Sequence, residues 1–442
     1  MMRSLWSAVS GLNTHQMEMD VIGNNISNVN TTAFKASATG FQDVLYQTIK
    51  NGGAATQNRA STNTDQVGLG AKMGSIMVNI AKQGSAVMTN NVMDLMINGD
   101  SFFIISPDST NINYSRDGSF TIDAQGDLVT QNNGYYVMGV MGDGGVADGA
   151  AVTKIRVIDR VAMPDKNDPT VTREVDFMPG APTTSCYMKG NLDSDDASLK
   201  EGKGLKLEIY GNDGQRYTLK YTVTNAGDDD ISTFNLTLSQ ILDSNGKIVG
   251  STASDPIELV YDKHNGRLLT NERVQVTVQG NEGTIGSFEL DLSNTTNYAS
   301  SLSNHSSTIY AYRGNTEGLN TGYPDGELTG ISFGDDGSVY GRYSNGQTIK
   351  KAQIAVAEFA NAMGLEQVGD NLYAESLNSG TAQILDITRN GGYMNSGYLE
   401  GSNVDLAKEF TDMITTQRGF QANSRVITTS DEMLQVLKGL KR

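Results

Sequence analysis

Few residues in this chain have the type and spacing that catalysis or metal binding requires. The 442 residues include three histidines, none with a second ligand at helical or turn spacing, so we interpret His15, His264 and His305 as surface or structural residues. Acidic clusters at 193–196, 228–230 and 335–336 lack the twelve-residue calcium loop ending in Glu and are interpreted as solvated loops. We therefore predict no catalytic residue, no metal site and no bound cofactor.

Cys186 is the remaining residue with reactive chemistry. A single cysteine excludes an intrachain disulfide and a cysteine-cluster metal site. In a predicted strand it can be a small, half-buried residue without function. The alternative is a covalent cross-link between subunits, formed by its sulfur, or by the elimination product, with a lysine of a neighbour.

The composition describes an acidic, turn-rich protein. The chain has 49 glycines, 7 prolines and a net charge of -17, a surface that repels nucleic acid and anionic membranes. No apolar run has transmembrane length, and the first residues lack the apolar core and cleavage site of a secretory signal peptide. We therefore expect no membrane span, and any export must use another route.

Two stripes of apolar residues at seven-residue spacing, one near each end, indicate the elements that organise the chain. Seven residues make two helical turns, so each stripe lies on one helix face and favours a partner helix, as in a coiled coil. We predict a helix–helix and subunit interface at Leu5, Leu12, Met19, Ile26, Leu406, Met413, Phe420, Ile427 and Leu434. On pattern alone, the helices either become ordered on assembly or dock as a pair on their own chain.

Between the helices the sequence reads as strand and turn. From about residue 204 to 293, apolar residues alternate over six predicted half-buried strands, which is typical of a sandwich or barrel. Strand signals resume after about residue 330, so we expect that segment to complete an earlier sheet. The polar stretch 51–70 is interpreted as an extended connector with weak internal structure.

These patterns predict a nested, mainly β chain with terminal α-helices and antiparallel β domains. We place a terminal helical domain at 1–30 with 402–442 and a connector region at 31–71 with 365–401. An inner β domain is predicted at 72–150 with 308–364, and an inserted outer β domain at 151–307.

Both ends resemble bacterial flagellar rod and hook proteins. The opening SAVSGLNTHQMEMDVIGNNISNVNTTAFK matches the family's pattern at Ser7 or Ser10, Gly11, Leu12, Asn24, Asn25, Ile26, Asn28, Thr32, Phe34 and Lys35. The closing helix matches at Ser402, Asn403, Val404, Asp405, Leu406, Gln417, Arg418, Phe420, Ala422 and Asn423. Segments 67–73, 98–105, 114–136 and 359–380 resemble the family's inner sheet domain, and the large insertion favours the hook branch.

The resemblance implies a structural subunit and not an enzyme. Terminal helices of many copies would form a coiled-coil-like inner layer around a channel, giving a curved, flexible tube that transmits torque from rod and motor to filament. Torsional stiffness is then expected in the helical wall, and bending compliance in the outer domains and connectors. Asn24, Asn25, Asn28, Phe34 and Lys35 form the implied connector motif, wedged between neighbours.

The resemblance also implies partners and a location. The expected partners are copies of the chain itself, the distal rod protein, the hook cap, the hook–filament junction proteins and the flagellar type III export apparatus. The expected location is the extracellular hook of the flagellum, reached unfolded and without signal cleavage. Alternatives are a distal rod protein, a secreted β-rich adhesin or carbohydrate-active enzyme, and a flagellin or hook–filament junction protein.

Overall fold

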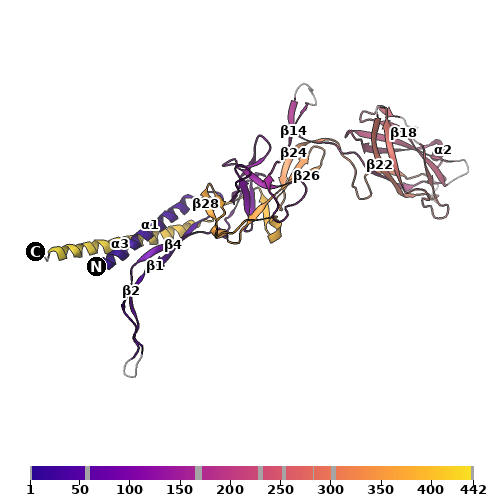
Figure 1. The fold of residues 1–442 in the computed structure, drawn as a ribbon. Coiled ribbons are helices and arrows are strands. Elements are labelled where there is room, and N and C mark those ends of the chain that lie inside the picture. Colours follow the sequence, from indigo (N-terminus) through magenta and orange to yellow (C-terminus); the bar gives the residue numbers. More distant parts are fainter. Residues whose placement is uncertain are drawn as a thin grey trace. The chain divides into compact units, whose positions relative to one another are not determined.

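The computed structural model describes residues 2–54, 60–164, 172–226, 232–250, 255–281, 283–299 and 305–439, so the acidic cluster at 228–230 lies outside the described residues (Figure 1). The chain divides into two compact units. The first contains residues 1–158, 331–341 and 349–442, and the second contains 159–330 and 342–348. The predicted class, mainly β with terminal helices, is confirmed. The finer division into four nested parts stays a prediction.

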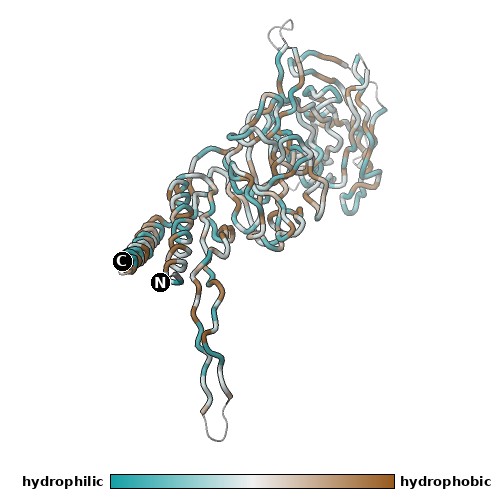
Figure 2. The backbone as a smooth tube through the Cα atoms, turned by 60° about the vertical axis from the view of Figure 1, so that its left-hand side comes forward, coloured by the Kyte–Doolittle hydropathy of each residue, from teal (hydrophilic) through white to brown (hydrophobic). Residues whose placement is uncertain are grey.

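The two long helices lie at the ends of the chain, where no proline interrupts them. α1 spans Met2–Ser27 and α3 spans Leu406–Gly439. The Asp405 carboxylate caps α3 by accepting hydrogen bonds from the backbone N–H groups of Ala407 at 3.0 Å and Lys408 at 3.3 Å. Hydrophobic residues recur along both helices (Figure 2). None of the described helices has a stretch long and apolar enough to span a membrane.

The segment after α1 forms two antiparallel strand pairs. β1 (Ser37–Asp43) pairs with β4 (Ala71–Val78), and β2 (Tyr46–Lys50) pairs with β3 (Asp65–Gly68). The interpretation of 51–70 as an extended connector with weak internal structure stays a prediction; β3 lies within this stretch, and its ladder is held by backbone hydrogen bonds. All residues of β2 and β3 are exposed, so this second pair has no core of its own.

The remaining strands of the first unit surround two apolar clusters. β7 separates the clusters: Phe103 and Ile105 pack into one, and Phe102 and Ile104 into the other, as strand alternation requires. These elements are β5 (Ala86–Met88), β6 (Leu95–Asn98), β7 (Phe102–Ser106), β8 (Asn113–Ser115), β9 (Phe120–Ile122), β10 (Leu128–Thr130), β11 (Tyr136–Met141), β12 (Thr153–Lys154), β27 (Val356–Glu358), η1 (Ala362–Gly364), β28 (Glu366–Gly369), β29 (Leu372–Ala374), β30 (Gln383–Leu385), η2 (Ile387–Asn390), β31 (Tyr393–Ser396) and β32 (Tyr398–Glu400).

The chain returns to the first unit after the second, as predicted. It passes between the units within three strands, β24 (Gly326–Phe333), β25 (Ser338–Tyr343) and β26 (Thr348–Ile354). In the first unit, β26 pairs with β11, with Gly139 opposite Ile354. A late segment thus completes an early sheet.

The second unit encloses one large apolar cluster between two sheets. All six predicted strands are present, and Leu205, Leu207 and Ile209 show the alternate burial that predicted them. One sheet has the order β16-β17-β18-β19 with β20 on β18, and the other β21-β22-β15-β23. The β15–β22 ladder is parallel, which alternation could not reveal. The elements are β13 (Arg160–Pro164), β14 (Thr172–Met178), β15 (Ser185–Asn191), α2 (Ser198–Glu201), β16 (Lys203–Tyr210), β17 (Arg216–Asn225), β18 (Thr233–Leu242), β19 (Ile248–Gly250), β20 (Ile257–Val260), β21 (Arg273–Gly280), β22 (Gly283–Thr296) and β23 (Tyr310–Arg313).

Candidate functional site: the terminal helix pair and its buried junction

The two terminal helices pack against each other in antiparallel register (Figure 1). The Asn25 amide donates a hydrogen bond to Glu409 Oε2 at 3.2 Å, near the end of α1 and the start of α3. Towards the start of α1, Gly11 lies against Asn423. In both pairs the two residue numbers add up to 434. The helices are therefore in a register in which residue n of α1 lies opposite residue 434 − n of α3.

Two glycines permit the close approach of the helices. A Cβ atom on Gly11 would lie 2.6 Å from Asn423 Nδ2, and one on Gly419 would lie 2.7 Å from His15 Nε2. Both distances are shorter than real Cβ contacts, so a side chain at either position would require Asn423 or His15 to move. The residue numbers of His15 and Gly419 also add up to 434, so this pair fits the same register.

The residues buried most deeply in this pair are mainly small or polar. On α1 they are Ala8, Thr14, Ile22 and Asn25, and on α3 they are Glu409, Thr416 and Ser430. Each buried residue of α3 comes three residues after a residue of the predicted stripe. This is the spacing between the a and d positions of a heptad. The two helices therefore contact each other mainly through residues that lie next to the apolar stripes on each helix.

The predicted stripe residues lie at the margin of the pair. Leu406 and Leu434 are exposed, and the other seven, Leu5, Leu12, Met19, Ile26, Met413, Phe420 and Ile427, are half-buried. Further large apolar side chains of the helices are exposed, namely Trp6, Val9, Met17, Phe410, Ile414, Val426, Met433, Val436 and Leu437. The single chain thus leaves much of the apolar helix surface in contact with water.

The helix pair is joined to the sheets through Asn25. Its amide nitrogen donates to the Ser37 carbonyl at 2.8 Å, and its Oδ1 accepts from the Ser37 N–H at 3.0 Å. Together with the bond to Glu409, one buried side chain connects α1, the start of β1 and α3. Within the predicted connector motif, Asn25 is therefore the residue that joins the two helices to β1.

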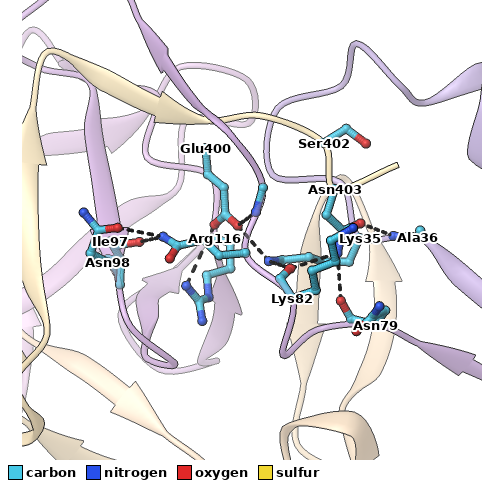
Figure 3. A network of polar contacts seen from close by, with 12 residues as sticks. Lys35, Ala36, Asn79, Lys82, Ile97, Asn98, Arg116, Glu400, Ser402 and Asn403 are labelled. Carbon is cyan, nitrogen blue, oxygen red and sulfur yellow. Dashed lines mark hydrogen bonds and ion pairs between the residues drawn. The ribbon is translucent and has the colours of Figure 1, made fainter. Parts of the chain in front are cut away.

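Lys35 lies in a buried ionic junction a few residues further on (Figure 3). Its ammonium donates to Glu400 Oε1 at 2.7 Å, and both side chains are 1% exposed. The same ammonium donates to the Lys82 carbonyl at 2.9 Å, and Glu400 Oε1 also accepts from the Gly84 N–H at 2.8 Å. Arg116 Nη1 lies 3.8 Å from Glu400 Oε2, close enough for an ion pair.

Asn403 connects the same segments from the start of the closing region. Its Oδ1 accepts from the Ala36 N–H at 2.7 Å, and its Nδ2 donates to the carbonyls of Asn79 and Lys82, each at 2.9 Å (Figure 3). The junction thereby ties residues 35–36, 79–84 and 400–403 together with charge-assisted and backbone hydrogen bonds.

The electrostatics of the junction follow from its burial. Burial lowers the pKa of Lys35, and the adjacent Glu400 carboxylate opposes this shift. Burial likewise lowers the pKa of Arg116. Removing one partner would leave a charge in a poorly solvated site, so this geometry favours a fixed connection over a hinge.

The other members of the predicted motif have local roles. Asn28 Nδ2 donates to the Asn24 carbonyl and to Asn24 Oδ1, each at 3.0 Å, in the turn that ends α1. Phe34 is half-buried, and its carbonyl accepts from the Asn403 N–H at 3.3 Å. Glu400 and Arg116 were missed as site residues. A lysine in a conspicuous motif signals an acidic partner, but the chain offers 50 acidic residues.

Cys186 lies in the second unit, in the core strand β15. Its side chain is fully buried, and burial raises the pKa of the thiol to about 12. In the folded chain the sulfur is therefore a protonated, enclosed thiol.

Comparisons with known proteins match both ends and the first sheet. Residues 5–35 match the family model "Flagella basal body rod protein", residues 96–171 "Flagellar hook protein FlgE/F/G D1 domain", and residues 395–440 "Flagellar basal body rod FlgEFG protein C-terminal". The flagellar hook protein FlgE of Borreliella burgdorferi is 34% identical, and that of Treponema pallidum 32% identical, each over 100% of both chains. The rod protein FlgG of Bacillus subtilis is 29% identical over 100% of both chains. The chain belongs to the flagellar hook protein family and is a structural subunit of the hook.

Proposed function

We propose that this chain polymerises through the exposed apolar faces of α1 and α3 into a hollow, curved tube, a flexible joint that transmits torque from the rod and motor to the filament. The observation that carries the proposal is the surface of the helix pair. Large apolar side chains, from Trp6 at 63% exposure to Val436 at 64%, recur along it. Large apolar side chains left exposed along a helix pair are typical of an association site.

The predicted stripes suit a subunit interface. Each half-buried stripe residue is partly covered within the single chain and keeps part of its side chain available to a second copy. The register extends this surface: α1 begins at position 2, which the register pairs with position 432, so α3 from Met433 onwards lies beyond α1. Met433, Leu434, Val436 and Leu437 are exposed there, along about 10 Å of helix.

The β2–β3 pair is a second proposed contact between copies. An isolated two-stranded hairpin is marginally stable in water. Leu45 is 78% exposed beside it, and Tyr46 and Ile49 are exposed within it. Packing between neighbouring subunits would cover these side chains, in agreement with the wedged connector that the resemblance implies.

The buried junction supports torque transmission within each subunit. A tube that transmits torque requires helices that do not rotate freely against the sheets. Lys35, Glu400 and Asn403 connect the segments next to both helices with short, buried hydrogen bonds. We place bending compliance in the contacts between subunits and not in this junction, which revises the expectation of a compliant connector.

Partners and location follow from the family. We propose contacts with the distal rod protein, the hook cap and the hook–filament junction proteins, and delivery by the type III export apparatus to the extracellular hook without signal cleavage. A lone cysteine fits a chain made in a reducing compartment and exported unfolded.

A cross-link through Cys186 stays a prediction. The buried thiol must first lose hydrogen sulfide to give dehydroalanine, and a neighbour's lysine amine must then add to the double bond. β15 would have to open for either step. Mass spectrometry of assembled polymer showing only intact Cys186 would rule the cross-link out.

Electron microscopy of basal bodies tests the proposed function. A strain lacking this chain should assemble rods that end without a hook, and intact hooks would contradict the proposal. The rod alternative has weaker support, because the compared rod protein is 29% identical and the compared hook proteins are up to 34% identical. Purified polymer should be curved; straight, stiff tubes would favour a rod.

A further inference from the structure

We propose that Asp193, Asp195 and His305 in the second unit form a binding site for a transition-metal dication, of which zinc is the probe of choice. The two aspartates follow β15, and His305 precedes β23. Because β15 and β23 are antiparallel neighbours, the end of one strand lies beside the start of the other. The fold thus supplies the second ligand that sequence spacing did not show for His305.

The distances between the ligand atoms suit a metal ion. His305 Nδ1 lies 3.3 Å from Asp193 Oδ2 and 4.0 Å from Asp195 Oδ2. Zinc bonds to nitrogen and oxygen of about 2.0–2.2 Å in a tetrahedron place neighbouring ligands about 3.3 Å apart. His305 Nδ1 and Asp193 Oδ2 share a hydrogen bond at this distance, which already holds the two ligands together. A rotation of the exposed Asp195 side chain would bring the third ligand to the required distance.

The three proposed ligands differ in burial: Asp193 is enclosed, whereas Asp195 and His305 are accessible to solvent. The Asp193 side chain is fully buried, and its Oδ1 accepts from the Asp195 N–H at 3.1 Å, which orders the loop. Asp195 is 56% and His305 35% exposed, so an ion can enter from solvent. The acidic cluster at 193–196 is therefore not the solvated loop that its composition predicted.

The donor set selects the type of ion. Calcium takes six to eight oxygen ligands, and magnesium favours oxygen and water. One imidazole nitrogen with two carboxylate oxygens instead fits zinc and similar dications. The nearby Lys203 ammonium is held by Asp196 at 3.6 Å and by the Ser307 carbonyl, so this cation is already engaged.

The other two histidines provide an internal contrast. His264 lies 3.4 Å from Asp262 Oδ1 and is 96% exposed, and His15 pairs with Glu18. Among the residues that the structure describes, the group around His305 is the one in which three such ligands converge. His264→Gln is therefore a matched control for His305→Gln.

Calorimetric titration of the metal-free full chain with zinc chloride tests the site. We expect one zinc ion per chain, a higher unfolding temperature of the second unit with zinc, and no displacement by excess magnesium. Asp195→Asn and His305→Gln should each weaken binding at least about tenfold and abolish the shift in unfolding temperature, whereas His264→Gln should change neither.

Circular dichroism of each variant checks folding, and the exposed Asp195 is the position that disturbs packing least. Zinc binding that His305→Gln and Asp195→Asn leave unchanged would overturn the proposal. The absence of zinc binding by the folded wild-type chain would also overturn it.

Discussion

The terminal helix pair and the second unit bury opposite kinds of side chain. In the second unit, Phe234, Leu290 and their neighbours fill a closed apolar core. In the helix pair, Thr14, Asn25, Glu409 and Thr416 are buried, while large apolar residues remain exposed. The second unit has a buried core of its own, whereas the helix pair exposes the apolar surface that we propose as a polymer interface.

The largest effect on the stability of the single chain should come from the closed core. Phe234→Ala removes a fully buried ring and should lower the free energy of unfolding of the second unit by about 3–5 kcal/mol. Denaturant titration followed by circular dichroism measures this change. Leu269→Ala, at a residue 66% exposed, is the control and should shift stability by less than about 0.5 kcal/mol. Equal effects would mean that the core is not closed.

The buried junction should rank next. Lys35→Met leaves the Glu400 carboxylate without its closest cation and should destabilise the first unit by about 3 kcal/mol. Hydrogen exchange of β1 and β4 would locate the loss. Lys82→Met is the control, because the network uses the carbonyl of Lys82 while its side chain is exposed. A junction that tolerates Lys35→Met would not be the rigid connection we describe.

Acid should weaken the first unit through Asp127. Burial raises the pKa of this carboxyl, but bonds from Lys154 Nζ at 2.6 Å and Arg156 Nε at 3.0 Å outweigh it and hold the pKa below its usual value. The folded chain therefore binds fewer protons than the unfolded chain, so this contribution is present above the unfolded pKa of about 4 and is lost as the pH falls below it towards the lowered pKa of the folded chain. Thermal unfolding of Asp127→Asn should show a shallower loss between about pH 5 and 3. A slope equal to that of the wild type would contradict this assignment.

Accessibility of the single thiol offers a smaller test of the same contrast. With its pKa raised to about 12 and its side chain buried, Cys186 should resist alkylation by iodoacetamide at pH 8 in the folded chain. It should react readily in denaturant. Rapid labelling of the native chain would show that β15 opens often, which would also make the cross-link easier to form.

Sequence reasoning succeeded where a residue pattern repeats. The alternation around Leu205 and Tyr217 predicted the strands of the second unit, and the seven-residue stripes predicted the terminal helices. It failed where distant segments meet. The partners of Lys35 are the Lys82 carbonyl and the Glu400 carboxylate, and no local spacing relates these residues. For the same reason the proximity of His305 to Asp193 was invisible, since 112 residues separate them.

The stripes also show a limit of periodicity itself. A stripe identifies the apolar face of a helix but not its partner. The register between Asn25 and Glu409 depends on polar side chains and on the glycines that allow close approach, and neither contributes to an apolar pattern. The structure was therefore needed to separate the surface used within the chain from the surface left over.

The most direct test of the account is assembly of a Leu434→Asp variant. Leu434 is 41% exposed and lies beyond the first turn of α1, so the substitution should leave the unfolding of the single chain unchanged within about 0.5 kcal/mol. Gln435→Asp adds the same charge at an exposed polar position of the same turn and is the matched control. Sedimentation and electron microscopy of the purified chains under polymerising conditions should show tubes for the wild type and Gln435→Asp, and only monomers for Leu434→Asp. Normal tubes from Leu434→Asp would contradict the claim that the exposed helix surface is the polymer interface.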